Sequence, residues 1–385
     1  FRIIAYIVGW VCNFQAAFMI LPLLTAGIYR EKDFSAFLLA MLVCLVVGVT
    51  LTRKKPKNKV FYIKDGCVAV ALSWLALCIF GAIPFVVSGY IPHPIDALFE
   101  TVSGFTTTGS SILSDVEVLP HCILIWRSFT HWIGGMGVLV FLLSLLPLAG
   151  GYHMNLMKAE SPGPSVSKLV PKVQSTAKIL YTIYFGMTLI QLALLLIGRV
   201  PLFDSLCITF GTAGTGGFGI VNDSLGSYST YCQVVTTIFM ILFGVNFSAY
   251  YLILTKKFRQ AFKYEEVRYY FGIIAVAIVI IALNTAHLFR NLLTAFQQAA
   301  FQVGSIITTT GFSSTDFNQW PALSKTVLVL LMFVGACAGS TGGGIKVSRI
   351  LILCKAAKKE FQLYLHPNAV KKIKMDDKVI THDIL

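Results

Sequence analysis

Charged residues are scarce in this chain. They make up 12% of its 385 residues, whereas 56% of the residues are hydrophobic. Because an ordinary soluble domain carries about 25% charged residues, the composition excludes that class of protein. The mean hydropathy of +0.76 predicts instead a protein that crosses a membrane several times.

Recognisable catalytic motifs are also missing from the sequence. The nine cysteines include no C-x-x-C pair and are expected to be small buried apolar residues. No H-E-x-x-H or G-x-S-x-G motif occurs, and His131, His153 and His287 have no carboxylate at metal-ligand spacing. We therefore expect neither an enzyme nor an organic cofactor. An intramembrane enzyme stays as an alternative that product formed from a lipid or a peptide would support.

Acidic residues are outnumbered, with 17 Asp and Glu against 31 Lys and Arg, which gives a net charge of +14. The positive residues cluster in short connections between apolar stretches, so we expect membrane lipids and no nucleic acid as contacts. Basic connections mark the cytoplasmic side of a membrane protein. This rule places both ends of the sequence in the cytoplasm of a multi-pass protein of the cytoplasmic (inner) membrane. The basic connections are 53–59, 150–178, 256–268 and 355–378.

Long apolar stretches are abundant, and about 20 apolar residues suffice to cross a bilayer as a helix. Three shorter apolar segments, 97–105, 204–211 and 291–303, are too short to cross and each leads into a glycine-containing loop. The sequence therefore predicts an all-α polytopic membrane protein built from a repeated unit of span, short helix, loop and span. The expected spans are 3–28, 34–51, 66–87, 122–148, 179–197, 231–254, 269–288 and 321–356.

The three glycine-containing loops are candidate cation-binding segments. Their sequences are FTTTGS, TAGTGGF and TTTGF, and irregular backbone at membrane depth is tolerated only inside protein or beside a wet cavity. Backbone carbonyls can replace the water shell of a weakly hydrated monovalent cation, whereas the Asp or Glu rings that suit divalent ions are absent from the loops. Ordinary helix-packing glycines are the alternative, and three loops at matching places argue against it. The candidate residues are Thr106, Thr107, Thr108, Gly109, Ala213, Gly214, Thr215, Gly216, Thr308, Thr309, Thr310 and Gly311.

A second glycine-rich segment, residues 335–344, interrupts the last apolar stretch. So many small residues cannot sustain a straight helix. We interpret the segment as a flexible gating loop, with a static packing kink and a phosphate-binding loop as alternatives; the spacing to Lys346 does not fit the second. The gating residues are expected to be Gly335, Ala338, Gly339, Ser340, Thr341, Gly342, Gly343 and Gly344.

Three basic residues lie within or beside these apolar stretches, where charge is costly. Arg127 is a candidate for a barrier or gating charge near the cation path, and a side chain that reaches the outer surface is the alternative. Lys346 and Arg349 are candidates for the same role, but a position at the inner membrane surface explains them better.

Several motifs together resemble the Trk/Ktr/HKT superfamily of potassium transporters, and most of all its TrkH branch. They are SGFTTTGSS, HWIGGMG, AESPGP, GGFG, TTTGFSSTDF, CAGSTGGGIKVSRI and HPNAV, in this order along the chain. The resemblance implies four channel-like units around one pore, preceded by two extra helices. It implies filter glycines at Gly109, Gly216 and Gly311, and potassium as the transported ion. It also implies a homodimer and a cytosolic, TrkA-like nucleotide-binding regulatory subunit as partners.

The expected division of the chain follows from this resemblance. Two N-terminal helices occupy residues 1–60, and pore repeats occupy 61–155, 156–260 and 261–360, followed by a cytoplasmic segment at 361–385. The family has a fourth repeat that this sequence does not reach, so we expect the sequence to be part of a longer protein. The predicted function is potassium uptake through a carbonyl filter. A secondary transporter of another solute is the alternative, although such proteins usually have inverted repeats.

Overall fold

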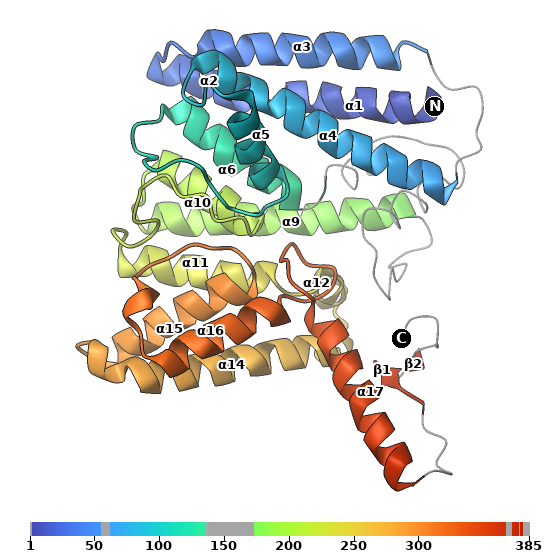
Figure 1. Cartoon of the computed structure of the whole chain (residues 1–385), viewed down its shortest axis with the longest axis vertical. Coiled ribbons are helices and arrows are strands. Elements are labelled where there is room, and N and C mark those ends of the chain that lie inside the picture. The colour runs from blue at the N-terminus through green and yellow to red at the C-terminus, as the bar shows by residue number, and fades with distance from the viewer. Residues whose placement is uncertain are drawn as a thin grey trace. The chain divides into compact units, whose positions relative to one another are not determined.

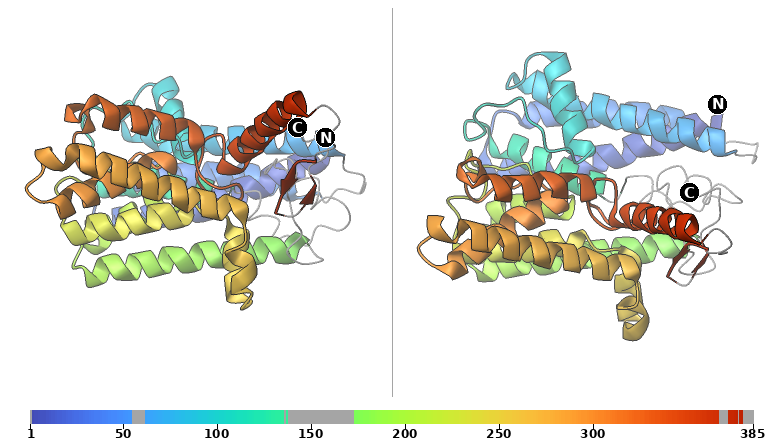
Figure 2. Two further views of the ribbon diagram at one scale, coloured as in Figure 1. Left: turned by 90° about the horizontal axis from the view of Figure 1, so that it is seen from below. Right: turned by 60° about the horizontal axis from the view of Figure 1, so that its bottom comes forward.

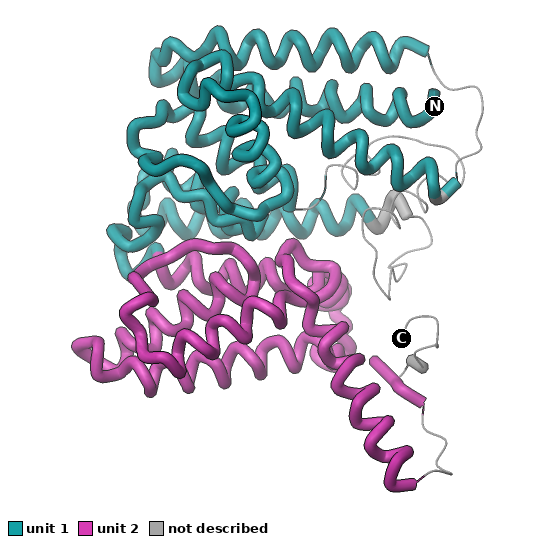
Figure 3. Tube along the Cα trace, in the orientation of Figure 1, with its two compact units in different colours: residues 1–232 teal, residues 233–385 magenta. Residues whose placement is uncertain are grey.

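The computed structural model describes residues 2–54, 62–135, 137, 173–366, 372–376 and 378–379. The chain forms two compact units, Phe1–Cys232 and Gln233–Leu385 (Figure 3). The AESPGP motif, most of the HPNAV motif and the end of the expected span 122–148 lie outside the described residues.

The first unit is a bundle of helices whose apolar side chains face both one another and the surroundings. Helices α1, α3 and α4 pack side by side (Figure 1), and α6 packs against α5 and α10. Trp126 of α6 is fully buried, and its indole N–H donates to the carbonyl of Gly81 at 3.1 Å. The helices are α1 (Arg2–Phe18), α2 (Ile20–Tyr29), α3 (Phe34–Thr52), α4 (Ile63–Ser88), α5 (Pro94–Phe105), α6 (His121–Gly135), α9 (Val173–Ile197) and α10 (Leu202–Ala213).

The second unit repeats part of this arrangement. The long helix α14 packs against the short helices α15 and α16, and α17 extends beyond them (Figure 1). The elements are α11 (Thr230–Phe243), α12 (Phe247–Leu254), α13 (Phe258–Ala261), α14 (Glu265–Thr285), η1 (Ala286–Leu288), α15 (Leu292–Ile307), η2 (Phe317–Gln319), α16 (Ala322–Val334), α17 (Val347–Leu365), β1 (Lys374–Met375) and β2 (Lys378–Val379).

The predicted membrane-spanning class agrees with the length and composition of the helices. Across the described ranges, five stretches are long and apolar enough to cross a membrane, and the pair α11 and α12 is a sixth candidate. The three short apolar segments expected to stop within the membrane are the helices α5, α10 and α15. The expected span 321–356 is divided by the glycine-rich segment into α16 and α17, as its composition indicated.

The expected continuous span 231–254 is wrong, because the chain bends by 94° between α11 and α12. The break falls at residues 244–246. Asn246 begins the new helix, since its side-chain oxygen accepts from the N–H of Ser248 at 2.9 Å. The short yellow helices that follow turn away from the axis of α14 (Figure 2). Helix α12 therefore leaves the direction of α11 before the basic connection 256–268 begins.

Candidate functional site

The three candidate loops share one backbone conformation. Each begins directly after a short helix, and the second residue of each loop has a left-handed backbone, with φ of 55° at Thr107, 53° at Thr215 and 58° at Thr309. A left-handed backbone is unfavourable for a β-branched residue such as threonine, so its recurrence at three equivalent places indicates a common constraint. The glycine two residues later also has positive φ in each loop, at Gly109, Gly217 and Gly311.

This register corrects the expected position of the second loop. The residue equivalent to Gly109 and Gly311 is Gly217, with φ of 79°, and not Gly216. Ala213 is the last residue of α10 and therefore precedes the loop. The prediction from the sequence placed the second loop at 213–216, one residue too early. Two adjacent glycines allow two alignments with the other loops. The equivalent segments are 106–109, 214–217 and 308–311.

Hydrogen bonds to the preceding helix set the shape of each loop. The N–H of Thr107 donates to Gly104, that of Thr215 to Thr212 and that of Thr309 to Ile306, at 3.0–3.1 Å. The next N–H in each loop donates five residues back, at 2.8–2.9 Å. Carbonyl groups at the end of the preceding helix thus accept from these N–H groups. This bonding fixes the orientation of the peptide units in each loop.

Threonine side chains add a second constraint in the first and third loops. The hydroxyl groups of Thr106 and Thr108 lie 2.8 Å apart, and those of Thr308 and Thr310 lie 2.7 Å apart. In each pair the first hydroxyl also donates to a helix carbonyl four residues earlier. The polar side chains of these loops are therefore bonded within the protein.

The second loop has glycine at both of these positions, and His131 of α6 fills the space. A Cβ on Gly214 would lie 2.1 Å from the carbonyl oxygen of His131, and one on Gly216 would lie 2.4 Å from its imidazole ring. The imidazole stacks on Phe218, with ring centroids 4.2 Å apart. His131 is fully buried, and neither ring nitrogen has a hydrogen-bond partner among the described residues. Packing against His131 thus replaces the threonine hydroxyl bonds in this loop.

Glycines of α6 bring this helix against both loops of the first unit. A Cβ on Gly134 would lie 2.0 Å from the carbonyl oxygen of Phe105, which directly precedes the first loop. A Cβ on Gly135 would lie 2.6 Å from the Cα of Gly214 in the second loop. The glycines of the HWIGGMG motif therefore permit a close approach of backbones that any side chain would prevent.

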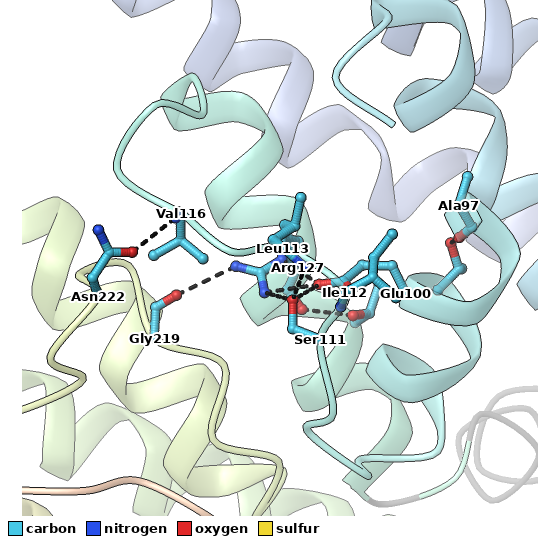
Figure 4. A network of polar contacts seen from close by, with 11 residues as sticks. Ala97, Glu100, Ser111, Ile112, Leu113, Val116, Arg127, Gly219 and Asn222 are labelled. Atoms are coloured by element: carbon cyan, nitrogen blue, oxygen red, sulfur yellow. Dashed lines mark hydrogen bonds and ion pairs between the residues drawn. The ribbon is translucent and has the colours of Figure 1, made fainter. Parts of the chain in front are cut away.

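A buried ion pair is hydrogen-bonded to both segments that follow the first two loops. Figure 4 shows Arg127 of α6 pointing at Glu100 of α5, and the Arg127 Nη2 and Nε atoms each lie 2.8 Å from Glu100 Oε1. Arg127 also donates to the hydroxyl of Ser111 and to the carbonyl of Gly219, both at 3.3 Å. The N–H of Ile112 donates to Glu100 Oε2 at 3.2 Å. One network thus joins the short helix α5, the middle of α6 and both segments that follow the loops.

The burial of Arg127 excludes the alternative that its side chain reaches the outer surface. The exposed fractions of the side chains are 2% for Arg127 and 0% for Glu100. The guanidinium carbon lies 4.2 Å from the centre of the Phe218 ring, a cation–π contact. Arg127 is therefore a paired internal charge.

The glycine-rich segment 335–344 contacts the third loop. The N–H of Gly343 donates to the hydroxyl of Thr309 at 2.7 Å, and a Cβ on Gly342 would lie 3.1 Å from the carbonyl oxygen of Thr308. All eight residues expected in the gating loop lie in this connection between α16 and α17. The segment therefore contacts the filter candidate directly.

The two other candidate charges have different surroundings. Lys346 directly precedes α17, and its ammonium group donates to the carbonyl of Gly342 inside the glycine-rich segment. Arg349 lies on the first turn of α17 and is exposed. The structure brings Lys346, but not Arg349, into contact with the expected gating residues.

No cluster of three or more His, Cys, Asp or Glu side chains that could hold a metal ion occurs within the described residues. Cation binding in this part of the chain would therefore depend on backbone and hydroxyl oxygens, which suit a monovalent ion.

A family model described as TrkH, cation transport protein, matches residues 33–385. The chain belongs to the TrkH family. Its relatives include the Trk system potassium uptake protein TrkH of Salmonella typhimurium, which is 36% identical over 395 residues, with 100% of this chain and 81% of that protein covered. The protein of the same name from Escherichia coli is 35% identical over 392 residues, with 100% and 81% covered.

A solved TrkH structure has the same fold. The crystal structure of the potassium transporter TrkH from Vibrio parahaemolyticus matches with a TM-score of 0.87 and 30% identity, over 99% of this chain and 80% of that chain. Membership of the TrkH family confirms the predicted all-α membrane fold and the prediction of a transport protein rather than an enzyme.

Three residues of this TrkH-family site were not predicted from the sequence. Glu100 was not singled out, although a carboxylate in a half-length apolar segment is itself a signal of a buried partner. Glu266, which bonds to the glycine-rich segment, lies in the connection 256–268 among other charged residues, so the sequence did not set it apart. His131 has no sequence signal, because its contact with the second loop depends on how α6 packs.

Proposed function

We propose that this chain takes up potassium across the cytoplasmic membrane, through a filter lined by backbone carbonyls of residues 106–109, 214–217 and 308–311. The observation that carries the proposal is the common left-handed backbone of the three loops at Thr107, Thr215 and Thr309. The relatives named as potassium uptake proteins support potassium as the transported ion.

Neutral oxygens explain the choice of ion. A potassium ion that enters a narrow site loses part of its water shell, and carbonyl dipoles offset this cost without binding the ion so tightly that it cannot leave. Each loop also follows the C-terminal end of a short helix, where the helix dipole is negative and favours a cation. Potassium is the cargo in this proposal, and the chain uses no organic cofactor.

The segment 335–344 acts as the gate in this proposal. Its contact with Thr309 supports the role, because a movement of the segment would change the surroundings of the third loop. Lys346 belongs to the gate through its bond to Gly342, and Arg349 supplies positive charge near the membrane surface. For Arg127 the burial and pairing favour a structural clamp over a barrier to the ion.

We further propose the assembly that the TrkH resemblance implies. The protein would act as a homodimer with a cytosolic TrkA-like nucleotide-binding subunit. The basic connections 256–268 and 355–378 are the surfaces that would attract an acidic partner. Both ends of the chain would face the cytoplasm, which agrees with the clustering of positive residues.

Rubidium uptake into potassium-loaded proteoliposomes tests the filter. The full-length protein is compared with Gly311→Ala and with a matched Gly272→Ala. A Cβ meets nothing within 4 Å at either glycine, but only Gly311 has positive φ, 86°. We expect Gly311→Ala to reduce uptake about tenfold, because alanine at this φ costs about 1–2 kcal/mol or shifts the loop. Gly272→Ala should transport normally.

Competition by other cations tests the identity of the ion. External potassium should suppress rubidium uptake, and the same concentration of sodium should not. Uptake that sodium suppresses equally, or equal uptake by Gly311→Ala and Gly272→Ala, would contradict the proposed potassium filter.

A further inference from the structure

Glu266 is a buried carboxylate at a junction of three chain segments. It is the second residue of α14 and only 3% exposed. Its Oε1 atom accepts from the N–H of Ala338 at 2.6 Å and from the N–H of Ser348 at 3.1 Å. Hydrogen bonds to an ionised acceptor are stronger than neutral ones, so these two contacts are a firm attachment.

The two donors belong to the glycine-rich segment and to the helix that follows it. Ala338 lies inside the segment, and Ser348 lies in the first turn of α17. The first N–H groups of a helix need acceptors from outside the helix. Lys346, the residue before α17, supplies none through its side chain within the described chain. Glu266 supplies the missing acceptor from another helix, and its negative charge suits a helix N-terminus.

The segment is also attached to the break between α11 and α12 by neutral backbone bonds. The N–H of Cys337 donates to Gly244 and the N–H of Phe247 donates to Gly339, both at 3.0 Å, at the break between α11 and α12. On its far side the segment donates from Gly343 to Thr309. A chain of contacts therefore leads from Glu266 through the segment to the third loop.

We propose that Glu266 is a positioning residue that holds the glycine-rich segment against the third loop, and that loss of its two bonds releases the segment. The effect on ion flux rests on the gating role proposed above. The effect on the conformation of the segment does not, so the two can be tested separately.

Native cysteines report the conformation of the segment without added labels. Cys337 lies in the segment and is fully buried, whereas Cys354 on α17 is exposed and Cys207 on α10 is buried elsewhere. The full-length protein in proteoliposomes is treated with N-ethylmaleimide, and the extent of modification at each cysteine is followed by mass spectrometry. Glu266→Gln is compared with the wild type and with Glu360→Gln, a matched change at an exposed residue of α17.

We expect Cys337 of Glu266→Gln to react about tenfold faster than in the wild type, since the neutral amide oxygen of glutamine accepts weaker hydrogen bonds than a carboxylate, which favours the released state. The rates at Cys354 and Cys207 should not change, and Glu360→Gln should match the wild type at all three cysteines. Glu266→Asp keeps the charge but shortens the side chain, and it should increase the Cys337 rate by a smaller factor. If Glu266→Gln does not fold, the comparison of Glu266→Asp with the wild type tests the proposal instead.

Rubidium uptake on the same samples separates the two proposals. Faster Cys337 modification with higher uptake in the absence of a regulatory partner supports both the positioning role and the gate. Faster modification with unchanged uptake supports the positioning role and contradicts the gate. An unchanged Cys337 rate in the folded Glu266 variants would overturn the inference, whatever the uptake.

Discussion

The guanidinium of Arg127 lies in an apolar unit and still makes three hydrogen bonds, one each to Glu100, Ser111 and Gly219, in addition to the ion-pair contact of its Nη2 atom with Glu100. Burial of two charges costs free energy that their attraction repays only when the geometry is good and other polar groups are satisfied. The partners of this pair directly follow the first and second loops. The free energy of the pair is therefore linked to the positions of those loops.

Single substitutions in this pair should be more harmful than the double substitution. Glu100→Gln leaves Arg127 as an unpaired buried charge, which costs about 3–5 kcal/mol of stability. We expect a lower melting temperature and lost rubidium uptake, with part of both recovered in Glu100→Gln/Arg127→Gln. Asp96→Asn, at a partly exposed position on the same helix, is the control. Higher uptake in Arg127→Gln alone would instead assign to Arg127 the barrier role considered from the sequence.

At the residue scale, the sequence identified Arg127 as a charge that is costly to bury, but it did not identify the partner of that charge. Arg127 was recognised because charge is rare in a span, whereas Glu100 stands 27 residues earlier along the chain. The pairing depends on how α5 and α6 pack, which no local pattern contains. The alignment of Gly217 with Gly109 and Gly311 likewise depends on where α10 ends.

Among the elements, α6 contacts both candidate loops of the first unit. Its first turn is fixed by a residue from the connection between α2 and α3. The carboxylate of Glu31 accepts from the N–H groups of His121 at 2.7 Å and Cys122 at 3.0 Å. Burial alone would raise the pKa of Glu31, but hydrogen bonds from Cys122 and His121 outweigh it and hold the pKa below its usual value. Glu31 thus acts as an N-terminal cap supplied from outside the helix.

This cap should make the stability of the first unit depend on pH. Because the pKa of Glu31 is lowered in the folded state, its stabilisation is present above the unfolded-state pKa and is lost as pH falls through the folded-state pKa. We expect Glu31→Gln to cost about 1 kcal/mol at pH 7, the usual size of a cap. The difference in melting temperature from the wild type should shrink toward zero in acid. A difference that does not change with pH would contradict the capping role.

The lengths of apolar segments were enough to predict most elements, including the short helices α5, α10 and α15. The break between α11 and α12 was missed because Gly244, Val245 and Asn246 lie in a strongly apolar run. Asn246 is a good N-cap residue, but its capping bond becomes visible only in three dimensions. The close approaches of Gly134 and Gly135 were equally hidden, since glycine in a membrane helix has several uses.

At the scale of the whole molecule, the basic residues behind the net charge of +14 differ in whether they are already bonded within the chain. Lys355 on α17 is already bound to the carboxylate of Glu265 and to the carbonyl of Lys374. Lys358 is exposed and Lys359 is half-buried on the same helix. These two lysines are therefore better candidates for attraction of a partner than Lys355.

Charge reversal at these lysines tests the proposed regulatory partner. Lys358→Glu/Lys359→Glu should weaken binding of an acidic cytosolic subunit about tenfold at low salt, with a smaller effect at high salt because the charges are exposed. The dissociation constant is measured on full-length protein in detergent. Lys325→Glu, on the helix α16, is a single charge reversal away from both basic connections and is compared with Lys358→Glu alone. Equal affinity of all variants would assign the basic connections to lipid headgroups and membrane orientation.

The contact between His131 and the second loop limits how these loops can be exchanged. The backbone of that loop matches the other two, but the side chain that supports it comes from α6. In a TTTG sequence grafted into positions 214–217, threonine at 216 would overlap the imidazole of His131, and threonine at 214 would overlap its backbone carbonyl. In protein engineering, and over evolutionary time, the exchangeable module is therefore the loop together with the part of α6 around position 131, and the two should vary as a pair.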